Sequence, residues 1–174
     1  MSKIGKKNIV IPKESSIRIE GGNLTISGPK GTKKLAINDK IFTSKLDDSE
    51  FKIQPLEKKV DKKTSIMWGT YRSLINNAVK GVSAGHEKIL ELSGVGFRAN
   101  LKGDLLNLQL GFSHDINFKI PKEVKITVEK QTIIKINGVD KELVSKIAAD
   151  LKSLKPIEPY KAKGIKERGQ FVLR

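Results

Sequence analysis

The chain contains one short pattern twice, as Ile9-Val10-Ile11-Pro12-Lys13-Glu14 and as Phe118-Lys119-Ile120-Pro121-Lys122-Glu123. Each copy has an apolar residue at alternate positions, which is typical of a strand, and a proline then interrupts it. A pair of alternating segments follows each copy, and the first pair is predicted to turn at Gly21-Gly22. We interpret the match as a duplication of one β-rich unit.

Each half also contains a segment with apolar residues at spacings of three and four, which predicts a helix. The first helix is expected to begin near Thr64 and to end at Gly81 or Gly85. Its predicted buried stripe consists of Met67, Tyr71, Leu74, Ile75, Ala78, Val79 and Val82. The predicted stripe of the second helix consists of Val144, Ile147, Ala148, Leu151 and Leu154.

These patterns predict an α+β fold with a duplicated domain and a basic C-terminal tail. Each domain is expected to be an antiparallel-rich β-sheet that a single α-helix covers on one side. We place the first domain at residues 1–82 and the second, with the tail, at residues 83–174, and expect the boundary between Val82 and Glu87.

The composition indicates a strongly anionic partner. Lysine and arginine number 34 against 19 acids, which gives a formal net charge of +15 and an isoelectric point of about 9.9. Nucleic acid and an anionic membrane both fit this charge. No apolar run approaches the roughly 20 residues that a membrane-spanning helix needs, so we expect no membrane partner.

A catalytic or metal site is not expected. The chain has no cysteine, which excludes thiolate metal sites and cysteine nucleophiles. Ser113, His114 and Asp115 are consecutive, whereas the members of a catalytic triad meet in space from separate positions. Carboxylate pairs such as Asp47-Asp48 lie in polar segments and are expected to be solvated. We therefore predict no enzyme, no cofactor, no metal and no small-molecule substrate.

The C-terminal segment Pro156–Gly169 concentrates cations after a proline that must end the second helix. Tyr160 can stack on a base, while the lysines and Arg168 can bind phosphates. We interpret these cations as unbalanced by nearby acids, on a backbone free to follow an irregular groove. A frayed, solvated basic end is the alternative.

Other cations lie in the N-terminal segment and beside predicted secondary structure, where surface ion pairs are the alternative for Arg72 and Arg98. RNA is favoured over DNA, because no recognition helix with a basic face is visible and basic arms on compact β-rich domains suit folded RNA. From the residues alone, the predicted RNA-binding set is Lys3, Lys6, Lys7, Arg72, Arg98, Lys155, Tyr160, Lys161, Lys163, Lys166 and Arg168.

The chain resembles the family of large-subunit ribosomal protein six over nearly its whole length. The resemblance is densest in Gly69–Leu74, Leu92–Ala99, Leu108–His114, Gly138–Lys141 and Glu158–Lys166. It implies two repeated sheet-and-helix domains that bind large-subunit rRNA near the sarcin–ricin loop and the stalk base. The implied neighbours are large-subunit proteins at the stalk base and translational GTPases.

For the tail, the resemblance implies RNA contacts by Tyr160, Lys161, Lys163, Gly164 and Lys166. The tail departs from the family at Ile157, where a second proline is frequent, at Ala162, where glycine is usual, and at Lys166-Glu167, where Arg-Tyr is common. Ala162 argues against a positive φ at this position, and Glu167 is expected to repel phosphate.

The sequence thus predicts a non-catalytic constituent of the large ribosomal subunit, in the cytoplasm of a bacterium or in an organelle. A freestanding basic RNA-binding or RNA-chaperone module is the alternative. A small hydrolase that uses His114 is a third class.

Overall fold

The computed structural model describes the chain except for residues 1, 21, 40, 47–49, 57–60 and 172–174. The predicted turn at Gly21-Gly22 therefore includes a residue, Gly21, outside the described residues. The predicted solvated pair Asp47-Asp48 lies wholly outside them. The chain divides into two compact units, Met1–Gly85 and His86–Arg174. The predicted limit at residue 82 lies inside the last turn of the first helix.

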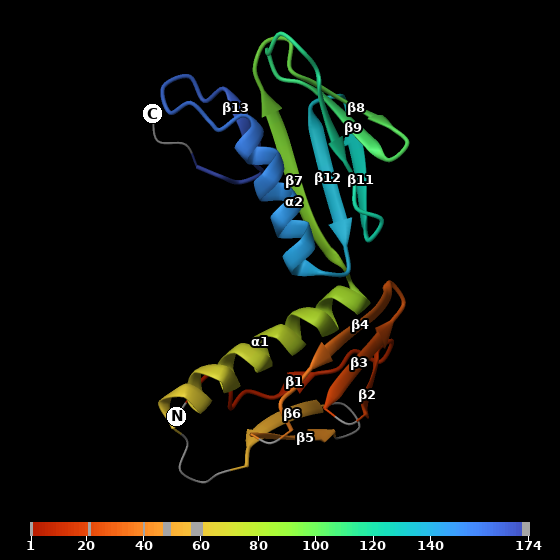
Figure 1. The fold of residues 1–174 in the computed structure, drawn as a ribbon, viewed down its shortest axis with the longest axis vertical. Coiled ribbons are helices and arrows are strands. Elements are labelled where there is room, and N and C mark those ends of the chain that lie inside the picture. Colours follow the sequence, from red (N-terminus) through yellow and green to blue (C-terminus); the bar gives the residue numbers. More distant parts are fainter. Residues whose placement is uncertain (1, 21, 40, 47–49, 57–60, 172–174) are drawn as a thin grey trace. The chain divides into compact units, whose positions relative to one another are not determined.

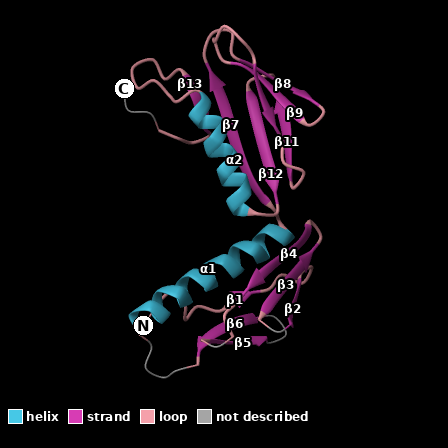
Figure 2. Cartoon of the chain, viewed as in Figure 1, coloured by secondary structure: helices cyan, strands magenta, loops and turns pink. Residues whose placement is uncertain are grey.

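The described residues of the first unit form two antiparallel three-stranded sheets, with strand orders β1-β6-β5 and β2-β3-β4, and one helix (Figures 1 and 2). The predicted single sheet is thus divided into two. The elements are β1 (Ile9–Val10), β2 (Ser16–Glu20), β3 (Asn23–Gly28), β4 (Gly31–Ala36), β5 (Phe42–Leu46), β6 (Glu50–Pro55) and α1 (Lys62–Ser83).

Helix α1 packs on strands β1, β3, β4 and β6 through a stripe that contains Trp68, Ile75 and Val79. Trp68 donates a hydrogen bond from Nε1 to the Ile53 carbonyl at 2.8 Å, so its polar atom is satisfied inside the core. The prediction for Leu74 is wrong: the residue is 42% exposed, because a helix turns about 100° per residue and Leu74 lies well to one side of the stripe.

The second unit has a four-stranded antiparallel sheet, β11-β12-β7-β13, a three-stranded antiparallel sheet, β10-β9-β8, and one helix. Its elements are β7 (His86–Ser93), β8 (Arg98–Lys102), β9 (Leu105–Gln109), β10 (Ile116–Lys119), β11 (Val124–Glu129), β12 (Ile133–Gly138), α2 (Lys141–Leu154) and β13 (Gly164–Glu167). Asp140 caps α2 by accepting a hydrogen bond from the Glu142 amide at 3.1 Å. Leu90 on β7, Leu106 on β9 and Leu151 on α2 belong to one core that joins both sheets and the helix.

The duplication is present, but the predicted alignment of its halves is wrong. In sheet order, β1-β6-β5 corresponds to β7-β12-β11, and β2-β3-β4 corresponds to β8-β9-β10. Strand β1 is therefore equivalent to β7, whereas the sequence pattern equated the β1 segment with the β10 segment. A strand followed by proline recurs easily in β-rich chains, so six similar residues do not establish a register. Strand β13 has no counterpart among the described residues of the first unit.

Candidate nucleic-acid interface

The C-terminal segment is fixed to the second unit as a strand. β13 pairs antiparallel with β7, with Ile165 opposite Leu92 and Lys166 opposite Glu91. Ile165 is buried, and its amide donates a hydrogen bond to the Lys155 carbonyl at 3.0 Å. The expectation of a backbone free to follow a groove is therefore wrong for β13, because the open edge of β7 supplies hydrogen-bond partners for it.

Gly164 allows the tail to fold back on itself. Its φ is +137°, and a Cβ atom at this position would lie 2.6 Å from the Pro156 carbonyl oxygen and 2.8 Å from Ile157 Cα. Only glycine accepts both the backbone angle and this approach without displacement of the chain. Because Gly164 is buried, the structure explains this glycine by packing within the tail.

The loop at 156–163 presents the aromatic ring and two lysines of the predicted interface. The Glu158 amide donates to the Lys163 carbonyl at 2.8 Å, and the Ala162 amide donates to the Glu158 carbonyl at 2.9 Å. Tyr160 is 86% exposed, and Lys161 and Lys163 are also exposed. Ala162 has a φ of 53°, so the argument against a positive φ at this position is wrong.

The two cations beyond this loop have an acidic partner. The Oε2 atom of Glu91 lies 3.1 Å from Lys166 Nζ, and its Oε1 atom lies 3.9 Å from Arg168 Nε. The prediction that these charges are unbalanced is therefore wrong for Lys166 and Arg168. The acid comes from β7, so its proximity depends on a strand pairing that the sequence did not reveal.

Glu167 has a structural role in the tail. Its carboxylate accepts a hydrogen bond from Lys88 on β7 and another from Lys152 on α2 at 3.4 Å. The Lys88 hydrogen bond, opposed by partial burial, holds the pKa of the Glu167 carboxyl below its usual range. This carboxylate therefore joins the tail to β7 and α2, a role that the sequence analysis did not predict.

The predicted N-terminal contacts belong to an arm that lies on α1. Arg72 donates hydrogen bonds to the carbonyls of Lys7, at 3.3 Å, and Asn8, at 3.4 Å. Gly5 is buried against the Trp68 ring, where a Cβ atom would lie 2.5 Å from the nearest ring atom. Lys3, Lys6 and Lys7 are exposed on this fixed arm, whereas Arg72 uses its guanidinium to hold it.

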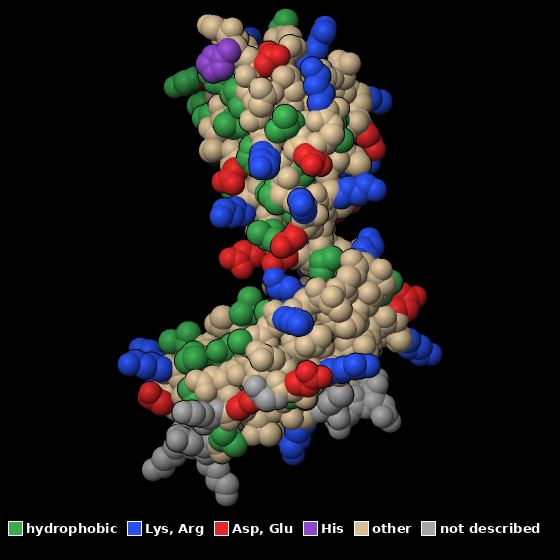
Figure 3. All heavy atoms as spheres, turned by 45° about the vertical axis from the view of Figure 1, so that its right-hand side comes forward, with side chains coloured by type: hydrophobic (Ala, Val, Ile, Leu, Met, Phe, Trp, Pro, Cys, Tyr) green, Lys and Arg blue, Asp and Glu red, His purple; other side chains and the backbone are tan. Residues whose placement is uncertain are grey.

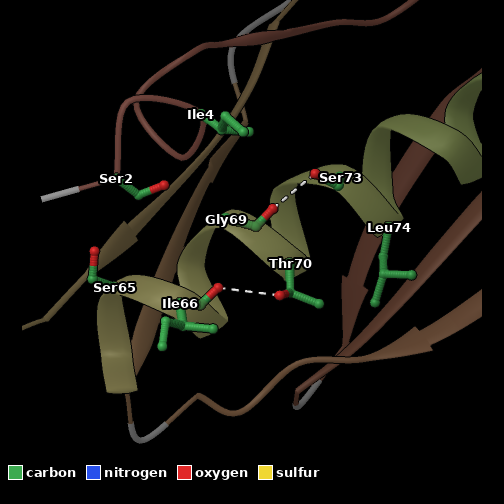
Figure 4. Close-up of a pocket in the computed structure, with 8 residues that line it drawn as sticks. All are labelled: Ser2, Ile4, Ser65, Ile66, Gly69, Thr70, Ser73 and Leu74. Atoms are coloured by element: carbon green, nitrogen blue, oxygen red, sulfur yellow. Dashed lines mark hydrogen bonds between the residues drawn. The ribbon is translucent and has the colours of Figure 1, made fainter. Parts of the chain in front are cut away.

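A pocket lies between this arm and α1 (Figure 4). Thr70 donates to the Ile66 carbonyl at 3.1 Å and Ser73 donates to the Gly69 carbonyl at 2.9 Å. Both hydroxyl groups therefore donate their protons to carbonyls of α1 itself. The pocket is lined by Ser2, Ile4, Ser65, Ile66, Gly69, Thr70, Ser73 and Leu74, without a charged side chain, so it offers no acid–base chemistry.

The remaining predicted residues lie elsewhere in the second unit. Arg98 is exposed at the start of β8, in a different sheet from β13. Lys155 follows α2, and its ammonium lies 4.7 Å from the centroid of the Phe112 ring. Phe112 was not among the predicted contacts, although an aromatic residue directly after a glycine was a visible signal in the sequence.

The surroundings of His114 do not form a catalytic arrangement in the part of the chain that the structure describes. His114 is exposed in the loop between β9 and β10, and the neighbouring Asp115 accepts a hydrogen bond from Gln109 at 3.3 Å. Among the described residues, no group of three or more His, Cys, Asp or Glu side chains could hold a metal ion. In the same part of the chain, neither helix is both long and apolar enough to cross a membrane.

The basic side chains are distributed and do not form one dense patch on the face drawn in Figure 3, where acidic side chains lie among them. The exposed cations of the arm, Lys3, Lys6 and Lys7, belong to the first unit. Lys161 and Lys163 in the tail loop belong to the second unit. Each unit thus carries its own fixed basic segment.

Comparison with known proteins identifies similar chains over the full length. The family model for Ribosomal protein L6 matches residues 11–85 and 93–168. The chain is 41% identical over 174 residues to a protein of Sphingopyxis alaskensis, with 100% of this chain and 97% of that protein covered. Proteins of Beijerinckia indica subsp. indica and Paracoccus denitrificans are 42% and 40% identical with the same coverage. All three are named large ribosomal subunit protein uL6.

Proposed function

The chain belongs to the ribosomal protein L6 family, and we propose that it binds large-subunit rRNA near the sarcin–ricin loop and the stalk base. It is a structural constituent of the large ribosomal subunit and not an enzyme. In this position it supports the region where translational GTPases dock, beside neighbouring large-subunit proteins. The three relatives compared above come from bacteria, and we propose the ribosome of a bacterial cytoplasm as its location.

The tail carries this proposal. Strand β13 and the turn at Gly164 fix the loop at 156–163 on a compact domain, so that Tyr160, Lys161 and Lys163 project from a defined place. Phosphate contacts by cations supply most of the affinity of such interfaces, and an exposed ring adds base stacking. We further propose the exposed cations Lys3, Lys6, Lys7 and Arg98 as additional RNA contacts, and Arg72 as the residue that orders the arm.

Sedimentation tests the assignment to the large subunit. In a sucrose gradient of a cell lysate, we expect the protein to co-sediment with large subunits at a salt concentration that removes loosely bound proteins. Recovery at the top of the gradient would instead support a freestanding RNA-binding module. Cross-linking of the protein to rRNA in isolated subunits then tests the position, which the proposal places beside the sarcin–ricin loop.

The salt dependence of RNA binding tests the tail cations. Replacement of Lys161 and Lys163 by alanine should flatten the slope of log affinity against log salt by about one unit per lost phosphate contact. Replacement of Lys166 and Arg168 should flatten it less, because Glu91 already neutralises part of their charge. Replacement of Lys102 and Lys125, exposed on β8 and β11, is the matched control. Equal slopes for the Lys161 and Lys163 variant and the control would contradict these contacts.

A further inference from the structure

The loop between β9 and β10 holds an exposed phenylalanine on a well-packed support. Phe112 is 45% exposed and follows Gly111, which has a φ of +74°. Beneath the loop, the Phe97 ring packs against the core. Cβ atoms at Gly111 and Gly94 would lie 3.4 and 2.8 Å from this ring. Phe97 therefore fills the space under two glycine loops, and the loop that carries Phe112 rests on a packed ring.

Lys155 connects this loop to the tail. Its ammonium lies 4.7 Å from the Phe112 ring centroid, within the range of a cation–π contact. Its carbonyl accepts the hydrogen bond from the Ile165 amide, at 3.0 Å. The residue after helix α2 thus orients the Phe112 ring and anchors strand β13, at the base of the loop that exposes Tyr160 and its lysines.

The surroundings of Phe112 identify the kind of partner. The tail residues 155–163 include Lys155, Lys161 and Lys163 against the single acid Glu158. An exposed ring in contact with the Lys155 ammonium, at the start of a segment that also carries Lys161 and Lys163, matches a ligand that combines a flat apolar face with negative charge. An unpaired RNA nucleotide has both features, whereas the bases of a continuous duplex expose no face for stacking.

We infer that Phe112 is a base-stacking residue that receives an unpaired nucleotide of RNA, while the exposed lysines of the tail loop bind phosphates of the same RNA. This inference rests on the proposed function and specifies the form of RNA at the tail end of the second domain. Phe112 and Tyr160 then provide two aromatic contacts from two loops that Lys155 joins.

Binding by the full chain to three RNA probes tests the inference. The probes are a large-subunit rRNA fragment with the sarcin–ricin hairpin, an unstructured oligoribonucleotide of equal length, and a continuous RNA duplex. Phe112→Ala should weaken binding to the fragment and the oligoribonucleotide roughly 5- to 100-fold, and should change duplex binding less than about twofold, since a duplex offers no base face. Phe112→Leu should behave as alanine does, and Phe112→Trp should restore binding.

Leu105→Ala is the matched control, because Leu105 lies in the same domain and is also 45% exposed; it should leave all three affinities unchanged. Wild-type affinity of Phe112→Leu for the oligoribonucleotide would overturn the inference, as would an equal loss of duplex binding by Phe112→Ala. If the wild-type chain bound the rRNA fragment no more tightly than the oligoribonucleotide, the proposed rRNA location would fail. The Phe112 variants on the oligoribonucleotide would still decide the stacking role.

Discussion

The two domains have equivalent sheets but differ at their first strand. In the first domain β1 has two residues and pairs with β6, and the chain before it lies on α1. In the second domain β7 has eight residues and pairs with both β12 and β13. The edge of β7 that does not face β12 is long enough to pair with β13, which occupies it. The length of this one strand therefore lets the second domain hold the basic tail loop.

The basic segments of the two domains are also held by different contacts. Two contacts hold the N-terminal arm. Gly5 packs against the Trp68 ring, and Arg72 donates hydrogen bonds to the carbonyls of Lys7 and Asn8. The tail is held by the pairing of β13 with β7 and by the close turn at Gly164. It also forms ion pairs between Lys166 and Glu91 and between Glu167 and Lys152. We therefore expect changes in the tail to affect the stability of the second domain and to leave the first domain unchanged.

Gly164→Ala should have the largest effect, because it makes the second domain resemble the first. The added Cβ would meet the Pro156 carbonyl and Ile157 Cα, and alanine disfavours a φ of +137°, so we expect a loss of about 2–4 kcal/mol in the second domain. Hydrogen exchange should show faster exchange of the β13 amides and of the β7 amides that face them. Fluorescence of Trp68, the single tryptophan, should show unchanged unfolding of the first domain.

Gly169→Ala is the matched control for this effect. Gly169 also has a positive φ, of +85°, but a Cβ atom there would have no neighbour within 4 Å. We expect a cost of about 1 kcal/mol from the backbone angle alone. Equal costs for the two variants would show that the close approach of Gly164 to Pro156 does not fix the tail.

The sequence predicted the elements that have strong local periodicity. The α2 stripe follows from residue spacing, and the structure buries its members Val144, Ile147, Ala148 and Leu151. For α1, the same reasoning included the exposed Leu74 and overlooked the buried Trp68, although it placed the adjacent Met67 in the stripe. Spacing rules find a helix more reliably than they find the edges of its buried face.

The tail strand could not be predicted in the same way. β13 has one fully apolar residue, Ile165, and its pairing with β7 joins segments more than 70 residues apart. The partners of Lys166 and Glu167 depend on that pairing, so the sequence indicated an unbalanced cation at Lys166 and an acid that repels phosphate at Glu167. The composition of the tail was enough to predict Tyr160, Lys161 and Lys163 as candidate contacts. The structure places all three at the surface.

The Glu167 ion pairs should make tail docking depend on pH. The pKa of Glu167 is lowered in the folded chain, relative to about 4.3 in an unfolded chain. The pairs to Lys88 and Lys152 therefore stabilise the second domain above about pH 4, and this stabilisation is lost as the pH falls through the folded pKa. The side chain is 27% exposed, and solvent screening limits the effect to about 1 kcal/mol.

Glu167→Gln measures this contribution. We expect the variant to be less stable than the wild type in urea at pH 6, as followed by hydrogen exchange of the β13 amides. The difference in stability should shrink as the pH falls through the lowered pKa of Glu167. Glu129→Gln is the control, because Glu129 pairs with Lys135 at 2.6 Å in the same domain but outside the tail. The ion-pair argument would be wrong if the wild type and Glu167→Gln lost equal stability between pH 6 and pH 3.

Ala162→Gly should have the smallest effect, and it should be stabilising. An alanine with a φ of 53° costs about 1–2 kcal/mol relative to right-handed geometry, while glycine adds about 0.4–1 kcal/mol of unfolded-chain entropy. We therefore expect a net gain of about 0.5–1 kcal/mol, with slower exchange of the Glu158 and Ala162 amides. Ala84→Gly, at a φ of −89°, should instead destabilise its domain. If Ala162→Gly lowered stability, the alanine side chain would be contributing contacts that outweigh its backbone strain.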